Sequence, residues 1–154
     1  MSEVARIAEL LEQGVLGAPY HGPSALTILR PVTRDLAIRR TQPDLHTIWE
    51  LVAHMTAEFT YARSLVDGSA TPWNEGQTTW PTIADTSESA WRSTIRDFED
   101  GHRNFQEFLA RLDDEVLDHP AVHGSHSVHA VLHGVIQHCA YHAGQIALLT
   151  RQLA

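Results

Sequence analysis

Hydrophobic side chains recur every three or four positions through most of this chain, which is the spacing of amphipathic helices. Near the start, Val4, Ile7, Ala8 and Leu11 follow this spacing, and it stops at the glycine-rich stretch that begins at Gly14. Glycine is a common end point for a helix. We therefore expect a first helix from Val4 to about Gly14.

Three longer stretches keep the same spacing, and residues that start or stop helices bound each of them. No segment alternates between polar and apolar residues as a half-buried strand would. The pattern predicts an all-α fold, a four-helix bundle of one domain over residues 1–154. The long helices are expected over Asp44 or Leu45 to Val66, Thr86 to Asp113 or Leu117, and Ser125 or Ser127 to Leu153, with shorter pieces at Pro23–Arg30 and Thr33–Arg39.

The first two long helices are separated by a loop at residues 69–81 that is rich in proline and glycine. It contains two tryptophans, Trp73 and Trp80. Loops of this length in a compact domain are often functional. Trp80 is therefore a candidate for the wall or the lid of a pocket.

Composition excludes several classes of function. The net charge of −8 argues against a nucleic-acid partner, because phosphate binding needs clustered cations. No apolar run is long enough to cross a membrane, and the N-terminus does not resemble a signal peptide, so we expect a cytoplasmic protein. The single cysteine, Cys139, cannot form an internal disulfide and is expected to be buried and inert.

Histidine is the unusual component, with 11 in 154 residues. His138 and His142 are one helical turn apart, so both imidazoles lie on one face of the last helix. A helical wheel places His142 within the apolar arc and His138 at its edge. A second pair with this spacing on the same helix, His129 and His133, points to a different face, where we expect solvent or a contact between subunits.

A third histidine, His54, lies at the edge of the apolar stripe of the first long helix, and Glu58 follows it by one turn. Three imidazoles and a carboxylate would then point inward from two helices. Burying such groups without a partner is costly, and a divalent metal would satisfy them while leaving a position open for catalysis. The alternative is that these are hydrogen-bonded histidines of the core.

Several residues around this cluster have two interpretations. Tyr141 and Gln145 flank the ligand pair and would either line a pocket or orient a ligand, or else pack in the bundle or face solvent. His46 would cap the first long helix or line the pocket, and we favour capping. Four other histidines are expected on the surface: His102, His119, His123 and His126.

Four stretches, in this order along nearly the whole chain, are similar to one known family: Tyr20–Ser24, His46–His54, Asn74–Pro81 and Leu132–Leu149. The chain thus resembles the DinB-like superfamily, also called the YfiT-like metal-dependent enzymes. The most specific parts of this resemblance are the runs His133–His138 and Tyr141–Ile146.

The resemblance implies a four-helix bundle that commonly forms a homodimer and acts on a small molecule. It also implies one divalent transition metal, such as zinc, nickel, iron or cobalt, held by one histidine of the second helix and two of the fourth. Carried over by position, these ligands are His54, His138 and His142, the set that the helical wheels select.

Two chemistries follow from the resemblance. In the one we prefer, the metal activates a low-molecular-weight thiol, a cosubstrate that is transferred to an electrophile. In the other, a hydrolase, the metal activates water, and Glu58 serves as proton acceptor or fourth ligand. A third reading is a metal-binding, dimeric stress protein without catalytic turnover.

Overall fold

The computed structural model describes residues 1–69, 79–122 and 126–154. Within these ranges the chain is helical and contains no sheet; the one strand-like contact is a bridge between Pro120 and Ser127. No helix in the described ranges has the length and apolar character needed to cross a membrane. The helices are α1 (Glu3–Val15), α2 (Ala25–Leu29), α3 (Arg34–Ala37), α4 (Ile48–Asp67), α5 (Glu88–Leu109) and α6 (Val128–Leu153), with a 3₁₀ turn η1 (Asp114–Val116).

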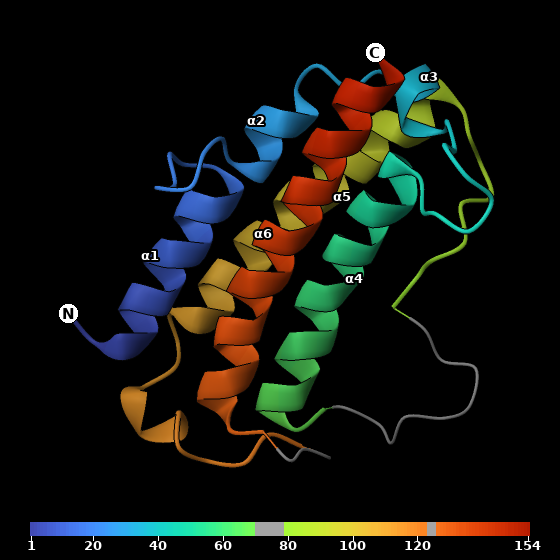
Figure 1. Ribbon diagram of the computed structural model, residues 1–154. Coiled ribbons are helices and arrows are strands. Elements are labelled where there is room, and N and C mark those ends of the chain that lie inside the picture. Colours follow the sequence, from blue (N-terminus) through green and yellow to red (C-terminus); the bar gives the residue numbers. More distant parts are fainter. Residues whose placement is uncertain (70–78, 123–125) are drawn as a thin grey trace.

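The four long helices α1, α4, α5 and α6 pack side by side as a bundle (Figure 1). Helix α6 contacts α1 on one side and α4 on the other, and α5 also packs against both. Helices α1 and α6 run in one direction, and α4 and α5 run in the opposite direction (Figure 1). The predicted all-α, four-helix architecture is thus confirmed.

Helix α4 begins three or four residues later than the sequence pattern predicted. The Thr47 hydroxyl accepts a hydrogen bond from the Glu50 amide at 3.1 Å, and the Glu50 carboxylate accepts one from the Thr47 amide at 2.8 Å. This reciprocal capping box fixes the first turn at Ile48 rather than at Asp44 or Leu45.

Helix α5 ends earlier than predicted, at Leu109 rather than at Asp113 or Leu117. The chain leaves the helix and presents the Asp114 carboxylate to the start of α1. There it accepts hydrogen bonds from the amides of Glu3 and Val4, at 2.8 and 2.9 Å. These amides have no partner inside their own helix, so Asp114 satisfies them across the fold.

Aromatic side chains fill much of the core between α4 and α5. Phe98 is fully buried, and its ring lies 5.8 Å from that of Phe59, which lies 5.6 Å from the ring of Phe105. Trp49 is also buried, and its indole N–H donates to the Thr94 hydroxyl at 2.8 Å. Trp49 is therefore a packing residue of the core.

His102 corrects one prediction from the sequence, because it is only 2% exposed instead of lying on the surface. Its helix, α5, turns this position toward α1. The Gln106 amide nitrogen donates both to His102 Nε2 at 3.2 Å and to the Ala8 carbonyl at 2.8 Å. Burial lowers the pKa of His102 to about 4, with the nearby Arg103 charge adding to the shift. His102 is therefore neutral at neutral pH.

Candidate metal centre

The three predicted ligands, His54 of α4 and His138 and His142 of α6, come together where the two helices pack. One ring nitrogen of each lies within 4.8 Å of the others. The Nε2 atoms of His54 and His138 are 2.9 Å apart. His54 and His142 are each 6% exposed, and His138 is half-buried. The structure thus brings together the residues that the helical wheels selected.

Two residues near the end of the loop hold the ring of His54, one at its edge and one on its face. Its Nδ1–H donates to the Thr79 carbonyl at 2.8 Å, so Nε2 carries the lone pair that faces the other histidines. Trp80 stacks on the ring, with centroids 3.8 Å apart and planes 6° apart. These two contacts fix both the tautomer and the orientation of His54.

His142 is oriented in a similar way by a residue of its own helix. Its Nδ1–H donates to the Gln145 side-chain oxygen at 2.6 Å, which leaves Nε2 as the acceptor. This agrees with the interpretation of Gln145 as a residue that orients a ligand. His138 differs, because its Nδ1 is buried and has no hydrogen-bond partner among the described residues.

All three imidazoles are held in their neutral form. Burial lowers the pKa of His138 to about 4, and the neighbouring His142 and His54 add to the shift. Burial is also the main cause of the lowered pKa of His54 and of His142, although the hydrogen bonds that these rings donate to Thr79 and Gln145 partly oppose it. Neutral imidazole is the form that binds metals.

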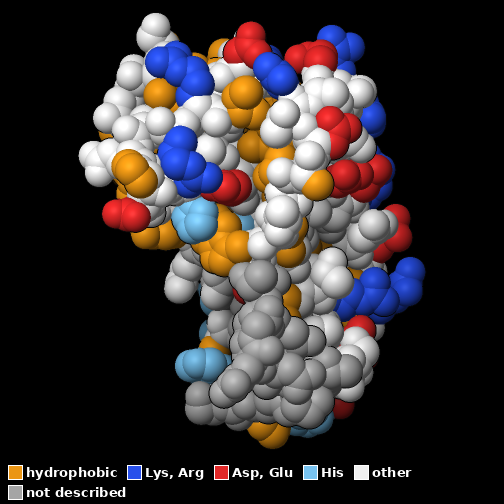
Figure 2. Space-filling view, turned by 90° about the vertical axis from the view of Figure 1, so that its right-hand side faces the viewer, with side chains coloured by type: hydrophobic (Ala, Val, Ile, Leu, Met, Phe, Trp, Pro, Cys, Tyr) orange, Lys and Arg blue, Asp and Glu red, His pale blue; other side chains and the backbone are white. Residues whose placement is uncertain are grey.

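A cavity of about 410 Å³ opens beside the histidine cluster and reaches His142. Trp80 and Tyr141 line it, so the prediction of Trp80 as a pocket wall is confirmed. Leu148 and Leu149 supply an apolar wall, and the whole lining is Asp44, Leu45, His46, Leu51, Trp80, Tyr141, His142, Gln145, Leu148, Leu149 and Gln152. On the described part of one face, histidine lies next to hydrophobic side chains, whereas acidic and basic side chains are interspersed above it (Figure 2).

His46 does not cap α4, which corrects the favoured interpretation; Thr47 holds that position. Instead His46 lines the cavity and stacks on Trp80, with centroids 3.6 Å apart. Trp80 therefore lies between the rings of His46 and His54. Trp73, His123 and residues 74–78 of the proposed family run lie outside the described residues.

Two further residues singled out in the sequence, Glu58 and Cys139, do not belong to the ligand cluster. Glu58 is not among the three residues whose ligand atoms cluster, although burial raises the pKa of its carboxyl group. Cys139 is buried, and burial raises its pKa to about 12, with a smaller effect from Glu58. The thiol therefore stays protonated, as expected from the sequence.

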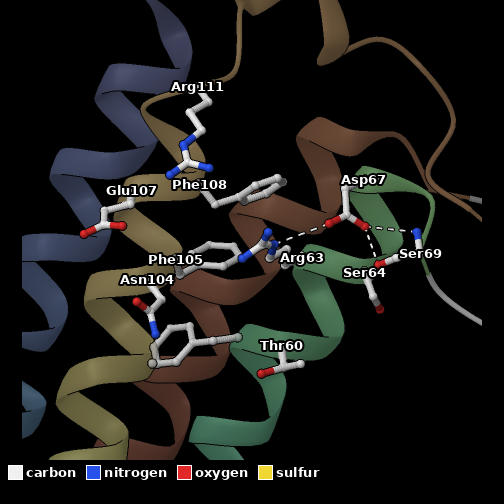
Figure 3. A pocket seen from close by; sticks show the side chains of 12 residues that line it. Thr60, Arg63, Ser64, Asp67, Ser69, Asn104, Phe105, Glu107, Phe108 and Arg111 are labelled. Atoms are coloured by element: carbon white, nitrogen blue, oxygen red, sulfur yellow. Dashed lines mark hydrogen bonds and ion pairs between the residues drawn. The ribbon is translucent and has the colours of Figure 1, made fainter.

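A larger cavity, about 500 Å³, lies between α4 and α5 (Figure 3). One of the arginines that line it, Arg63, already has partners. Its guanidinium pairs with Asp67 at 3.3 Å and lies 5.3 Å from the ring centre of Phe108. None of the three clustered histidines lines this cavity. We therefore place the candidate site at the smaller cavity, where the convergent ring nitrogens are.

A helical bundle with three histidines directed inward from two helices defines a class of candidate metal-binding proteins. Comparison with known families matches residues 22–146 to the DinB superfamily, and the chain belongs to that superfamily. The matched range contains all three clustered histidines. No curated protein and no solved structure matched the chain.

Proposed function

We propose that this protein binds one divalent transition metal at His54, His138 and His142 and uses it to transfer a low-molecular-weight thiol to a small electrophile. The observation that carries this proposal is the convergence of three imidazole nitrogens within 4.8 Å, beside a cavity of about 410 Å³. Cavities of a few hundred Å³ suit small molecules.

The donor set fits a metal. Nε2 of His54 and Nε2 of His142 carry the lone pairs that a metal needs, because Nδ1 of each ring donates a hydrogen bond. The 2.9 Å between the Nε2 atoms of His54 and His138 is near the roughly 3.3 Å expected for two nitrogens that share a tetrahedral ion. Three imidazoles suit zinc, nickel, iron or cobalt and leave room for an exogenous ligand.

When bound, such a cation lowers the pKa of a thiol in contact with it, so that the thiolate exists at neutral pH. The chain's own residues orient and enclose the reactants. Gln145 holds the ring of His142, and Trp80, Leu148 and Leu149 form an apolar wall of the cavity beside it. In the transfer, the thiolate sulfur forms a bond to carbon, the leaving group departs with its electron pair, and the thiol proton goes to solvent.

The hydrolytic alternative needs a base to accept a proton from the attacking water. Glu58 is the carboxylate that the sequence offers for this role, but it is not part of the ligand cluster. The absence of Glu58 from the cluster argues against a role as fourth ligand, and thiol transfer requires no carboxylate at this position.

Elemental analysis and a thiol panel test the proposal. Untagged protein, purified without added metal, is analysed for bound metal and then assayed with several thiols and electrophiles. We expect turnover that depends on thiol, and we expect His138→Ala to lose both the metal of this site and the turnover. His126→Ala removes an exposed histidine near the start of the same helix and serves as the matched control.

Two results would contradict the proposal in different ways. If His138→Ala retained the metal at this site, the assignment of His138 as a ligand would be wrong. Bound metal with ester or amide cleavage but without thiol-dependent turnover would favour the hydrolase, and metal without either reaction would favour a non-catalytic protein.

A further inference from the structure

A second group of potential ligands lies on the opposite side of α6, where α1 packs. It consists of Glu3 in the first turn of α1 and of His129 and His133 in the first two turns of α6. One ligand atom of each residue lies within 4.8 Å of the other two. The helical wheel assigns the two histidines to solvent or to a subunit contact, and it cannot link them to Glu3, which is more than a hundred residues away along the chain.

The distances show that the three groups surround one point. A single oxygen of Glu3, Oε1, lies 3.9 Å from Nε2 of His129 and 3.7 Å from Nε2 of His133. Both distances are too long for hydrogen bonds. Two donors about 2.0–2.1 Å from a shared tetrahedral ion lie roughly 3.4 Å apart. Both Glu3 distances are therefore within about 0.5 Å of this spacing, and a ring nitrogen of each histidine lies within 4.8 Å of one of the other.

The strongest sign of a missing partner is at His133. Its Nε2 is shut off from solvent and has no hydrogen-bond partner among the described residues. Leaving such an atom unsatisfied is costly, and a cation would satisfy it. The other ring of the pair, His129, lies 4.4 Å away between centroids and is 47% exposed, so the group remains accessible to an ion from solution.

The fold holds Glu3 in place for this role. Its amide donates to Asp114, and its second carboxylate oxygen, Oε2, pairs with Arg6 at 3.1 Å. Oε1 is therefore the oxygen left to face the histidines. The Arg6 guanidinium also repels a cation, and the group is more exposed than the three-histidine cluster. Binding here should accordingly be weaker than at His54, His138 and His142.

We propose that Glu3, His129 and His133 form a second metal site, which takes a divalent transition ion such as Zn²⁺ and clamps the first turn of α1 to the start of α6. Two imidazoles and one carboxylate are a donor set that suits such ions, with a water completing the coordination. The site is distinct from the three-histidine cluster, which uses a different face of α6 and a different neighbouring helix.

The test uses the full, untagged chain with Zn²⁺ as the probe. In a calorimetric titration of metal-free protein, we expect two ions per chain, the second bound more weakly. His138→Ala should abolish the tight site and keep the weaker one, so this proposal can succeed even if the three-histidine proposal fails. His133→Ala and Glu3→Gln should each keep the tight site and weaken the other by at least 10-fold, since even a ligand's hydrogen-bond partner contributes about 10–100-fold.

Glu3→Gln keeps the backbone contact with Asp114 and the size of the side chain, so loss of the fold does not explain its effect. Glu9→Gln changes an exposed carboxylate of the same helix and is the matched control. A second ion that survives in both His133→Ala and Glu3→Gln would overturn the proposal, as would a single ion per wild-type chain that His138→Ala abolishes. So would a doubling of mass when Zn²⁺ fills this site in His138→Ala, because the ion would then bridge two chains.

Discussion

At the scale of single residues, the histidine cluster owes its geometry to neighbours that hold the rings. Gln145 is one turn from His142 and accepts the Nδ1–H of its ring. We expect Gln145→Ala to weaken metal binding by about 10–100-fold, because the freed ring would have to be ordered when the metal binds. A chelator-competition titration measures this affinity. Gln137→Ala, an exposed glutamine on the same helix, should leave it unchanged; equal affinities for the two variants would contradict the role of Gln145.

His102 gives a prediction about pH. Its pKa is about 4 in the folded protein and 6.5 when unfolded, so only the unfolded chain takes up this proton between those values. The contribution of His102 to stability is therefore complete above pH 6.5 and is lost as the pH falls toward 4, by at most about 3 kcal/mol. Glu12, whose carboxylate is 3.5 Å from Nε2, reduces the loss, whereas Arg103 adds to it, and Glu99 lines the same hollow.

Denaturant unfolding at several pH values measures this loss as a slope. His102→Leu should show a smaller fall in the free energy of unfolding between pH 6.5 and 4 than the wild type. The comparison uses the slope and not the absolute stability, because the substitution also removes the hydrogen bond from Gln106. Parallel pH profiles would show that His102 does not cause the loss.

The residues of the site could be predicted from the sequence only where the spacing along one helix carries the information. His138 and His142 are one turn apart, and the apolar stripe of α4 places His54 inward. Thr79, by contrast, lies 25 residues from His54, and no periodic pattern links a loop carbonyl to a helix side chain. The stack of His46 on Trp80 depends in the same way on how the loop returns to the bundle.

At the scale of helices, the Thr47 capping box sets the start of α4 and thereby the position of His54 two turns later. We expect Thr47→Ala to reduce the free energy of unfolding by about 1 kcal/mol, because the Glu50 amide loses its acceptor. Thr47→Ser keeps a hydroxyl and should recover most of this stability. Chemical denaturation distinguishes the two variants, and equal losses would show that packing of the Thr47 methyl group matters more than the cap.

Phe98 tests the packing between α4 and α5. Its side chain is fully buried against Phe59, so Phe98→Ala should cost about 3–5 kcal/mol of stability. Thermal unfolding followed by circular dichroism measures the effect. Ile95→Ala, at a partly buried position of the same helix, should cost clearly less. A comparable cost at both positions would mean that the ring does not anchor this interface.

Helix existence could be predicted from periodicity, but two helix ends could not. The sequence contains the capping residues Thr47 and Glu50, which mark the start of α4 at Ile48. The apolar pattern alone extends further back, and it therefore placed the expected start near Leu45. The end of α5 depends instead on Asp114 meeting the amides of α1, a contact across 110 or more residues. Such an end is decided by tertiary structure.

At the scale of the whole molecule, the two groups of ligands would tie α6 to α1 and to α4. The three-histidine cluster joins α6 to α4, and Glu3, His129 and His133 join it to α1. An ion that binds only the folded chain adds stability, about 2.7 kcal/mol when free metal is roughly 100 times the dissociation constant. Metal should therefore raise the unfolding midpoint in two steps, first at low and then at higher Zn²⁺ concentration.

Single-site variants separate these steps. His138→Ala should remain helical without metal, because the apolar core lies around the cluster and does not depend on it, and it should lose only the first step. His133→Ala should lose only the second step. Hydrogen exchange then locates each effect: the second step should protect amides at the start of α1, where Glu3 lies. Protection that appears only in α4 and α6 at every Zn²⁺ concentration would show that no ion joins α1 to the bundle.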